Sequence, residues 1–213
     1  MSATGWGKRD PGEPAALRRE HQRHRILLAA LEVFGTRGSA VSTVQDVIGE
    51  ARVSRATFYR LFADKESCLA ALHDELLTWL WDEVAVTVAD VETWPLQLRA
   101  AVERTIELLA DDPRVARICA VEVYAAGSEL RARHDRLVKD LGDLLRLGRA
   151  ERPGGAELPA LLEPMLARGA ISIAGRSIVY RQSPAPASLG AELSQFMLIP
   201  YLGAKEAKAL IAS

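Results

Sequence analysis

The sequence predicts an all-α protein of about nine helices, in which three N-terminal helices precede a larger helical domain. Apolar residues recur every three or four positions along most of the chain, which is the period of a helix with one buried face. No segment keeps the alternation of apolar and polar residues that a half-buried strand needs. Gly and Pro residues separate the periodic segments, as expected of connections between helices.

The first predicted helix follows a basic run, RREHQRHR, at residues 18–25. Its buried face is formed by apolar residues at helical spacing: Ile26, Ala29, Ala30, Val33 and Phe34. Gly38 is placed as its C-terminal stop. The basic run is either a solvated helix end or part of a functional surface. His21 and His24 lie within it without suitable Cys or acidic partners nearby, so no metal site is expected.

Two short helical patterns around a tight break occupy residues 41–66, VSTVQDVIGEARVSRATFYRLFADKE. Ser42 is followed three residues later by Gln45, which predicts a capping box at the start of the first of these helices. Ser54 offers an N-cap for the second. Asp64 can cap a third helix in the same way. This arrangement is typical of a helix-turn-helix DNA-binding unit.

The second helix of this unit has an outward surface suited to DNA. Phe58 and Leu61 face the first helix, which leaves polar side chains outside. Arginine can bind guanine edges, threonine a thymine methyl or a phosphate, and tyrosine a phosphate. A lysine in the first turn of the third helix is also well placed for a phosphate. We therefore predict DNA contacts from the following residues: Thr43 at the start of the first helix, Arg55, Thr57, Tyr59, Arg60 and Lys65.

These motifs resemble those of the TetR/AcrR family of one-component regulators. TFYRLFADKE, residues 57–66, is similar to the family's T-x-Y-x-x-F-x-x-K-E core, and VSTVQDV resembles its second-helix start. The resemblance is specific over about residues 20–80 and only architectural beyond them. One departure is Arg52, where the family usually has Gly in the turn. A non-Gly residue with positive φ costs roughly 1 kcal/mol, so the turn is either reshaped or strained.

The resemblance implies a repressor that a small molecule releases from a palindromic operator, and it divides the chain accordingly. Residues 1–17 are rich in Gly, Pro and Ala without periodicity and are expected to be a disordered tail. Residues 18–64 would form the helix-turn-helix domain and residues 65–88 a linking helix. Residues 89–213 would form the effector-binding and dimerisation domain.

The rest of the chain is predicted as a series of helices separated by breaks. Pro113 suits the first position of one of them. The helix that includes Pro164 is expected to begin or bend there. The predicted ranges after the linking helix are 95–110, 113–126, 128–149, 159–181 and 187–199.

Dimerisation is expected through the last two of these helices, because the resembling family forms a four-helix interface there and helix-turn-helix units usually act as symmetric dimers. Small residues on one side would allow another helix to approach closely. The alternative, from the residues alone, is ordinary core packing. The predicted interface residues are Ala167, Ala170, Ile171, Ala174, Ile178, Leu189, Leu193 and Phe196.

The resemblance also implies a pocket for a small apolar or amphipathic effector in the middle of the chain. Glu122 lies inside an apolar run, so its carboxylate should be paired, protonated or facing a cavity. Trp79, Trp94, Tyr124 and Arg176 are the other amphipathic groups that can line a cavity. The alternative interpretation is that each of these residues is an ordinary core aromatic residue or a surface charge without a role in ligand binding.

Charge is divided unevenly along the chain. Lys and Arg number 27 in total and Asp and Glu 28, but residues 1–65 hold 11 and 7, which leaves 16 and 21 for the rest. Positive charge is therefore concentrated where phosphates would be neutralised. The N-terminus lacks the apolar core of a signal peptide, so a cytoplasmic protein is expected. Cys68 and Cys119 fit small buried hydrophobic positions better than redox sites.

The sequence leaves two other classes of function to consider, an architectural DNA-binding protein and an enzyme. An architectural DNA-binding protein without an effector would need no cavity. An all-α enzyme fused to a DNA-binding unit would need catalytic motifs, but the sequence has no Gly-rich phosphate loop, paired-carboxylate motif, metal-spaced cluster or nucleophile elbow. We therefore expect neither an enzyme nor a cofactor.

Overall fold

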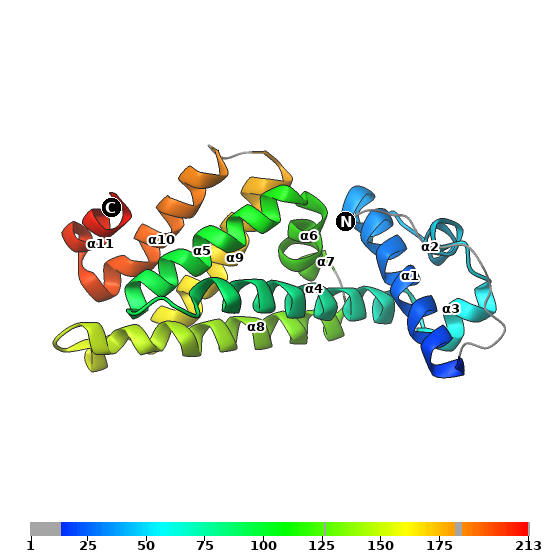
Figure 1. Cartoon of the computed structure of the whole chain (residues 1–213), viewed down its shortest axis with the longest axis horizontal. Helices are drawn as coiled ribbons and strands as arrows, with labels where there is room; N and C mark the ends of the chain where they lie inside the picture. Colours follow the sequence, from blue (N-terminus) through cyan, green and yellow to red (C-terminus); the bar gives the residue numbers. More distant parts are fainter. Residues whose placement is uncertain (1–13, 126, 182–184, 213) are drawn as a thin grey trace.

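The computed structural model describes residues 14–125, 127–181 and 185–212, which are mostly helical and include no strand (Figure 1). The all-α prediction is confirmed. One end of the elongated molecule holds three helices: α1 (Ala15–Arg37), α2 (Val44–Ala51) and α3 (Arg55–Leu61). From this end α4 (Lys65–Val88) runs into the body, with α8 (Ser128–Arg146) beside it in the same direction.

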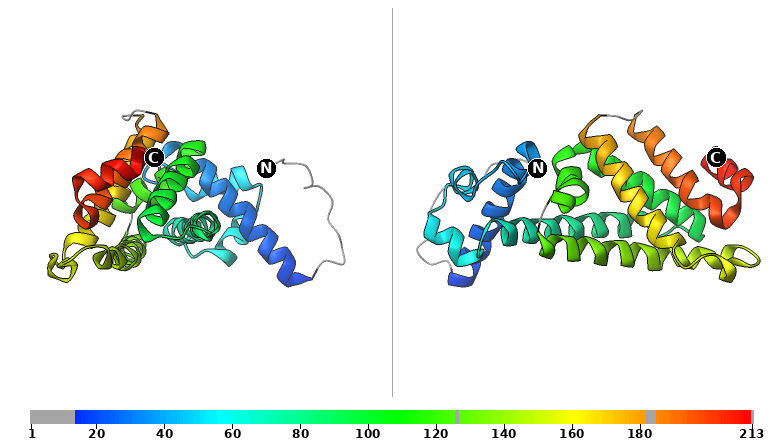
Figure 2. Two further views of the ribbon diagram at one scale, coloured as in Figure 1. Left: turned by 60° about the vertical axis from the view of Figure 1, so that its left-hand side comes forward. Right: turned by 180° about the vertical axis from the view of Figure 1, so that it is seen from behind.

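The body is built from antiparallel and crossing helices around these two. Its α10 (Pro186–Leu202) packs along α5 (Trp94–Asp111), and α9 (Leu162–Val179) packs along α8 on the face seen from behind in Figure 2. Pro164 lies in the first turn of α9, so this helix begins there rather than bending. The other elements of the body include α11 (Ala204–Ala212) and two 3₁₀ turns, η2 (Leu147–Glu151) and η3 (Gly155–Glu157).

The segment predicted as one helix over residues 113–126 is interrupted. It comprises α6 (Pro113–Ala116), a π-helical turn η1 (Arg117–Val121) and α7 (Glu122–Ala125). A π turn adds a residue to the helical repeat and rotates the side chains that follow it. Apolar periodicity alone does not reveal such a turn, because the flanking residues on both sides remain buried.

The N-terminus of α2 is capped one residue later than predicted. Thr43 is the N-cap: its backbone N–H donates to Asp46 Oδ2 at 2.8 Å, and its hydroxyl accepts from the Asp46 N–H at 3.2 Å. Ser42 is buried and its hydroxyl donates to Gly38 O at 2.7 Å, so it closes the α1–α2 loop instead. The predicted caps Ser54 and Asp64 are confirmed.

One hydrophobic core joins the N-terminal helices to the body. Phe34 of α1 and Phe58 of α3 are fully buried in the same cluster as Ile118 of η1. The helix α1 begins at Ala15, so the end of the predicted tail is helical, while residues 1–13 of that tail lie outside the described residues. No helix in the described ranges combines the length and apolar character of a membrane span.

Two histidines are buried where α4 and α8 pack together. His73 of α4 is 0% exposed and His134 of α8 is 2% exposed. Neither ring has a hydrogen-bond partner among the described residues. Burial, together with the nearby His134 and Arg133, lowers the pKa of His73 from 6.5 to about 4, and burial also lowers the pKa of His134. Both rings are therefore neutral at pH 7.

We expect the burial of these two histidines to make the free energy of unfolding depend on pH. The folded-state pKa of His73, about 4, is below the unfolded value of 6.5, so its contribution is complete above pH 6.5 and is lost as the pH falls toward 4. The free energy of unfolding should fall by up to about 3 kcal/mol over that range because of His73. His73→Leu should flatten the profile, measured by denaturant unfolding at a series of pH values. His24→Leu, at an exposed ring of α1, is the control, and parallel profiles for wild type and His73→Leu would contradict the assignment.

Candidate DNA-binding site and effector cavity

The exposed face of α3 carries a cation and an aromatic ring in contact. Phe58 is fully buried and fixes the rotation of the helix, while Arg55 and Tyr59 point away from the core. The Arg55 guanidinium carbon lies 5.4 Å from the centroid of the Tyr59 ring, and the edge of that ring packs on Phe58. Both side chains are exposed, and an arginine held at the surface by this stacking suits contact with a base edge.

The other predicted DNA contacts have partners within the chain. Arg60 donates to Gln22 Oε1 of α1 at 2.6 Å. The Thr57 hydroxyl lies 2.9 Å from the Ser54 hydroxyl, as part of the cap of α3. Thr43 is exposed at the N-terminus of α2, within the capping box. Of the predicted set, Arg55 and Tyr59 are therefore the most available for DNA.

Lys65 lies under the α1–α2 loop. Its ammonium donates to Ser39 O at 2.7 Å and to Ser42 O at 3.0 Å. These two bonds satisfy backbone carbonyls in the loop that leads directly into the cap of α2. In this structure Lys65 thus positions the start of α2, and the third N–H of its ammonium is not used by these carbonyls and can donate to a phosphate.

The turn between α2 and α3 keeps a left-handed residue although that residue is arginine. Arg52 has φ 51° and ψ 47°, so the turn is strained rather than reshaped. Arg25 of α1 offsets this cost, because its guanidinium donates to Ala51 O at 2.6 Å and to Arg52 O at 3.1 Å. The Arg25 contact satisfies the last carbonyls of α2 and holds the turn against α1.

Glu122 joins the DNA-binding end to the body. It is 5% exposed, and its Oε2 accepts hydrogen bonds from both the backbone N–H, at 2.9 Å, and the hydroxyl of Ser39. Arg117 lies 4.0 Å from Oε1. Gly38 has φ 88°, and a Cβ there would lie 3.3 Å from Glu122 Oε1. Of the three alternatives given by the sequence, paired, protonated or facing a cavity, the structure shows a paired carboxylate: its partner is the α1–α2 loop, and Glu122 does not line the cavity as predicted.

A largely apolar cavity of about 410 Å³ lies inside the body. Trp94 is the only predicted pocket residue in its wall. Tyr124 is 54% exposed and packs on His134, and Arg176 is exposed. The walls come from α4 (Leu77, Leu80, Trp81, Val84, Ala85, Val88), α5 (Trp94, Gln97, Leu98, Ala101, Val102, Thr105, Ile106, Leu109), η1 (Cys119, Ala120), α8 and η2 (Leu137, Leu141, Leu144, Leu145, Leu147), α9 (Ala167, Ala170, Ile171, Ala174) and α10 (Leu193, Met197).

Most residues predicted for the dimer interface face inward. Ala167, Ala170, Ile171, Ala174 and Leu193 line the cavity, Leu189 is buried, and Ile178 packs on the core. Of the predicted set, only Phe196 is half exposed. Both α9 and α10 carry apolar residues on two faces. The sequence does not show which of the two faces packs against the rest of the chain and which is exposed. The outward apolar residues are Leu161, Met165, Ile173, Phe196 and Ile199.

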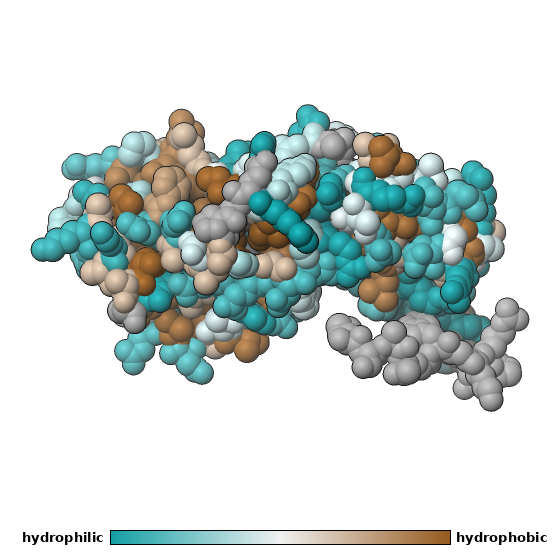
Figure 3. Space-filling view, turned by 90° about the horizontal axis from the view of Figure 1, so that it is seen from above, coloured by the Kyte–Doolittle hydropathy of each residue, from teal (hydrophilic) through white to brown (hydrophobic). Residues whose placement is uncertain are grey.

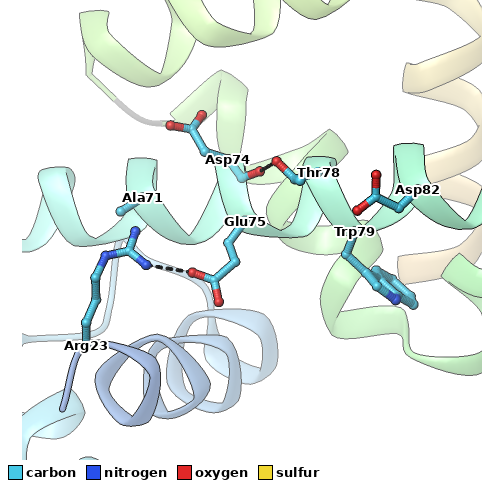
Figure 4. A pocket seen from close by; sticks show the side chains of 7 residues that line it. All are labelled: Arg23, Ala71, Asp74, Glu75, Thr78, Trp79 and Asp82. Atoms are coloured by element: carbon cyan, nitrogen blue, oxygen red, sulfur yellow. Dashed lines mark hydrogen bonds and ion pairs between the residues drawn. The ribbon is translucent and has the colours of Figure 1, made fainter. Parts of the chain in front are cut away.

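Hydrophobic residues also gather over the body in the view of Figure 3, whereas the DNA-binding end is mostly hydrophilic. A shallow second depression lies where α1 meets α4, and its wall includes Asp74, Trp79 and Asp82 (Figure 4). There Arg23 of α1 forms a 2.8 Å ion pair with Glu75 of α4. The depression is thus partly filled by a contact that holds α1 against α4.

Residues 26–72 match the family model for bacterial regulatory proteins of the tetR family. The chain is 26% identical over 143 residues to the fatty acid metabolism regulator protein of Bacillus subtilis, covering 67% of this chain and 74% of that protein. It is 29% identical over 135 residues to two uncharacterised HTH-type transcriptional regulators of Mycobacterium tuberculosis. The match spans 63% of this chain and 63% of each Mycobacterium protein, less than two thirds of their length.

Solved structures have the same fold. The fatty acid degradation regulator FadR of Bacillus halodurans has a TM-score of 0.71 at 19% identity, covering 90% of this chain and 97% of that one. FadR of Bacillus subtilis, solved in complex with stearoyl-CoA, has a TM-score of 0.68 at 21% identity, covering 84% and 98%.

The three N-terminal helices and the outward face of α3 define a helix-turn-helix DNA-binding protein with a helical body. The relatives named above are regulators and not enzymes. Residues 26–72 thus form the DNA-binding part that the tetR family of bacterial regulatory proteins shares, and the body has the fold of the solved regulators named above.

We expect Arg55 to carry base specificity. Arg55→Ala should cost roughly 1–3 kcal/mol on the preferred site and little on random DNA, because a bidentate contact to a base is lost. Tyr59→Phe is the matched control: it keeps the ring under Arg55 and removes only the hydroxyl, so any loss should be uniform across sequences. Selection from random DNA measures the sequence preference of both variants. If Arg55→Ala selects the same sequences as the wild type, Arg55 does not contact the bases that determine specificity.

Proposed function

We propose that this protein is a homodimeric transcriptional repressor that a small, largely apolar molecule releases from a palindromic operator. The observation that carries the proposal is the position of η1. Cys119 and Ala120 of this π-helical turn line the cavity, and Glu122, directly after it, binds Ser39 of the DNA-binding end. A molecule in the cavity therefore contacts the segment that holds the α1–α2 loop.

The linking helix offers a second connection to the same loop. Lys65, in the first turn of α4, binds the carbonyls of Ser39 and Ser42, and Trp81 and Val84 of the same helix line the cavity. The loop before α2 is thus held by two elements that both border the cavity. A ligand that favours one tilt of α4 or one position of η1 would change where α2 and α3 lie.

A small change in the distance between the two recognition helices is sufficient to release the dimer from a palindromic operator. The two recognition helices of a dimer must lie about one DNA turn, roughly 34–36 Å, apart to enter successive major grooves. If the ligand-bound protein no longer holds that spacing, only one half-site can be bound, and most of the affinity is lost.

The outward apolar residues of α9 and α10 support a dimer. Met165 is 70% exposed and Phe196 50%, and both lie on helices at the surface of the body (Figure 2). A two-fold pairing of these helices would remove this surface from water and place two α3 helices in one particle. The interface we propose is therefore the outward face of α9 and α10, in place of the inward residues predicted from sequence.

The alternative of an architectural protein without an effector fits less well. Such a protein has no use for an apolar cavity, and about 410 Å³ lies within the range of small-molecule sites. The Bacillus subtilis FadR structure, which contains stearoyl-CoA, further supports an effector with an apolar chain.

Dimerisation is tested by a charge at the proposed interface. Phe196→Glu should give monomers at micromolar concentration in light scattering and abolish operator binding while leaving helicity unchanged, because two carboxylates would be buried across the two-fold axis. Val86→Glu, at a residue of α4 that is 80% exposed, is the control and should remain dimeric. Monomeric wild-type protein would contradict the proposal.

The switch itself is tested by linkage. A panel of saturated-chain alcohols, acids and coenzyme A esters is first screened for binding to the protein. Each compound that binds is then titrated into the protein with and without operator DNA. Operator must weaken ligand binding by the same factor by which ligand weakens operator binding. Glu122→Gln, which weakens the contact to Ser39, should reduce this factor and leave the affinity for ligand alone unchanged. If no compound changes operator affinity, the proposed function is wrong.

A further inference from the structure

We infer that the effector is an uncharged lipophile, a neutral hydrocarbon chain or ring system with one hydroxyl donor, and not an organic anion, a cation or a coenzyme A ester. This inference rests on the proposed function, since it names the class of molecule that the same cavity accepts. It comes from the chemistry of the cavity walls and of the charged groups beside the opening.

The walls offer almost no polar atoms. Among the described lining residues, the side chains with polar groups besides the indoles are Gln97, Thr105 and Cys119. The Thr105 hydroxyl already donates to Ala101 O at 2.7 Å. Burial raises the pKa of the Cys119 thiol to about 12, so it stays neutral. The walls therefore carry no formal charge in the part of the chain that the structure describes.

Gln97 is the one directional anchor. Its Nε2 donates to Val91 O at 2.7 Å, which fixes the amide plane. Gln97 lines the cavity, and its amide keeps the Oε1 acceptor and the second N–H of Nε2 for a ligand. A hydroxyl can donate to Oε1 or accept from Nε2, whereas a carboxylate can only accept from Nε2 and would lie beside the lone pairs of Oε1. The anchor thus favours an alcohol over an acid of the same chain length.

A charged group inside this cavity would be unpaired. Transferring a carboxylate or an ammonium out of water without a partner costs several kcal/mol even after relaxation. The apolar walls supply no compensating ion pair. A charged headgroup would therefore have to remain at the opening.

The opening does not provide for such a headgroup. The exposed lining residues are Ala85 of α4 and Leu144 and Leu147 at the end of α8, so the cavity reaches the surface there. Beside Leu144, Asp143 binds Lys139 at 2.6 Å and Arg146 at 3.4 Å.

The next cations along the wall are also paired. Arg104 of α5 binds Glu83 of α4 at 2.8 Å. Arg149 is held by the buried Glu163, with its Nε 2.7 Å from Oε1. A headgroup with several phosphates would have to share these cations with the carboxylates that already bind them, and a neutral molecule leaves the pairs unchanged.

The test is a matched series with one twelve-carbon chain: dodecanol, dodecanoate, dodecyltrimethylammonium and dodecanoyl-coenzyme A. Binding to the full-length protein, below the aggregation concentration of each compound, is followed by the fluorescence of Trp81 and Trp94, which line the cavity. Dodecanol should bind at least tenfold more tightly than each charged analogue and should be the one that releases operator DNA.

The outcomes separate this inference from the proposed function. If dodecanoate, the ammonium or the coenzyme A ester binds as tightly as dodecanol and releases the operator, the inference is overturned and the proposed function stands. If none of the four binds, both are overturned.

Two variants test the anchor independently. Gln97→Leu should weaken dodecanol binding about fivefold, the usual effect of one lost hydrogen bond, and leave binding of dodecyl methyl ether, which has no donor, unchanged. Thr105→Val is the matched control, because the Thr105 hydroxyl is already bonded to Ala101 O. Equal losses for the alcohol and the ether in Gln97→Leu would show that Gln97 only shapes the wall.

Discussion

The contact between the Glu122 carboxylate and Ser39 determines how the DNA-binding helices are arranged relative to the helical body. A buried carboxylate is costly unless it is hydrogen-bonded, and here both hydrogen bonds come from the α1–α2 loop. The body therefore cannot shift relative to the DNA-binding helices without either carrying that loop along or leaving Glu122 unsatisfied. Gly38 permits the approach, because its φ of 88° and missing Cβ leave room for the carboxylate.

The same loop is held from a second side by Lys65, so charged groups from two elements converge on the backbone that precedes the Thr43 cap. Such polar contacts are directional and have few alternative arrangements, unlike apolar packing. A displacement of η1 or α4 should therefore move the α1–α2 loop as well, because these contacts cannot readily form in another arrangement. This property makes η1 and α4, which both border the cavity, suitable for the coupling that we propose.

The sequence predicts the helices well because their signals are local. The caps at Ser54 and Asp64 and the core position of Phe58 follow from residues within one or two turns. It fails where the decisive partner is distant. The sequence places Glu122 in the pocket because its partner Ser39 lies 83 residues away, and it places Ala174 in a dimer interface because both faces of α9 carry apolar stripes. The cavity itself has no local signal, since residues such as Leu137 and Leu141 have the same spacing in a filled core.

An apolar cavity of this size is itself an argument for a ligand. Unfilled apolar space lowers the stability of a protein, because the side chains around it lose packing contacts, and the cavity here measures about 410 Å³. Leucine or methionine at positions such as Ala101 or Ala170 would fill part of it at only a small cost in helix propensity. The chain instead keeps alanines there and surrounds them with leucines. A protein that only needed to hold two DNA-binding units apart would gain stability by closing this space, and the open space is consistent with a body that must accept an apolar molecule.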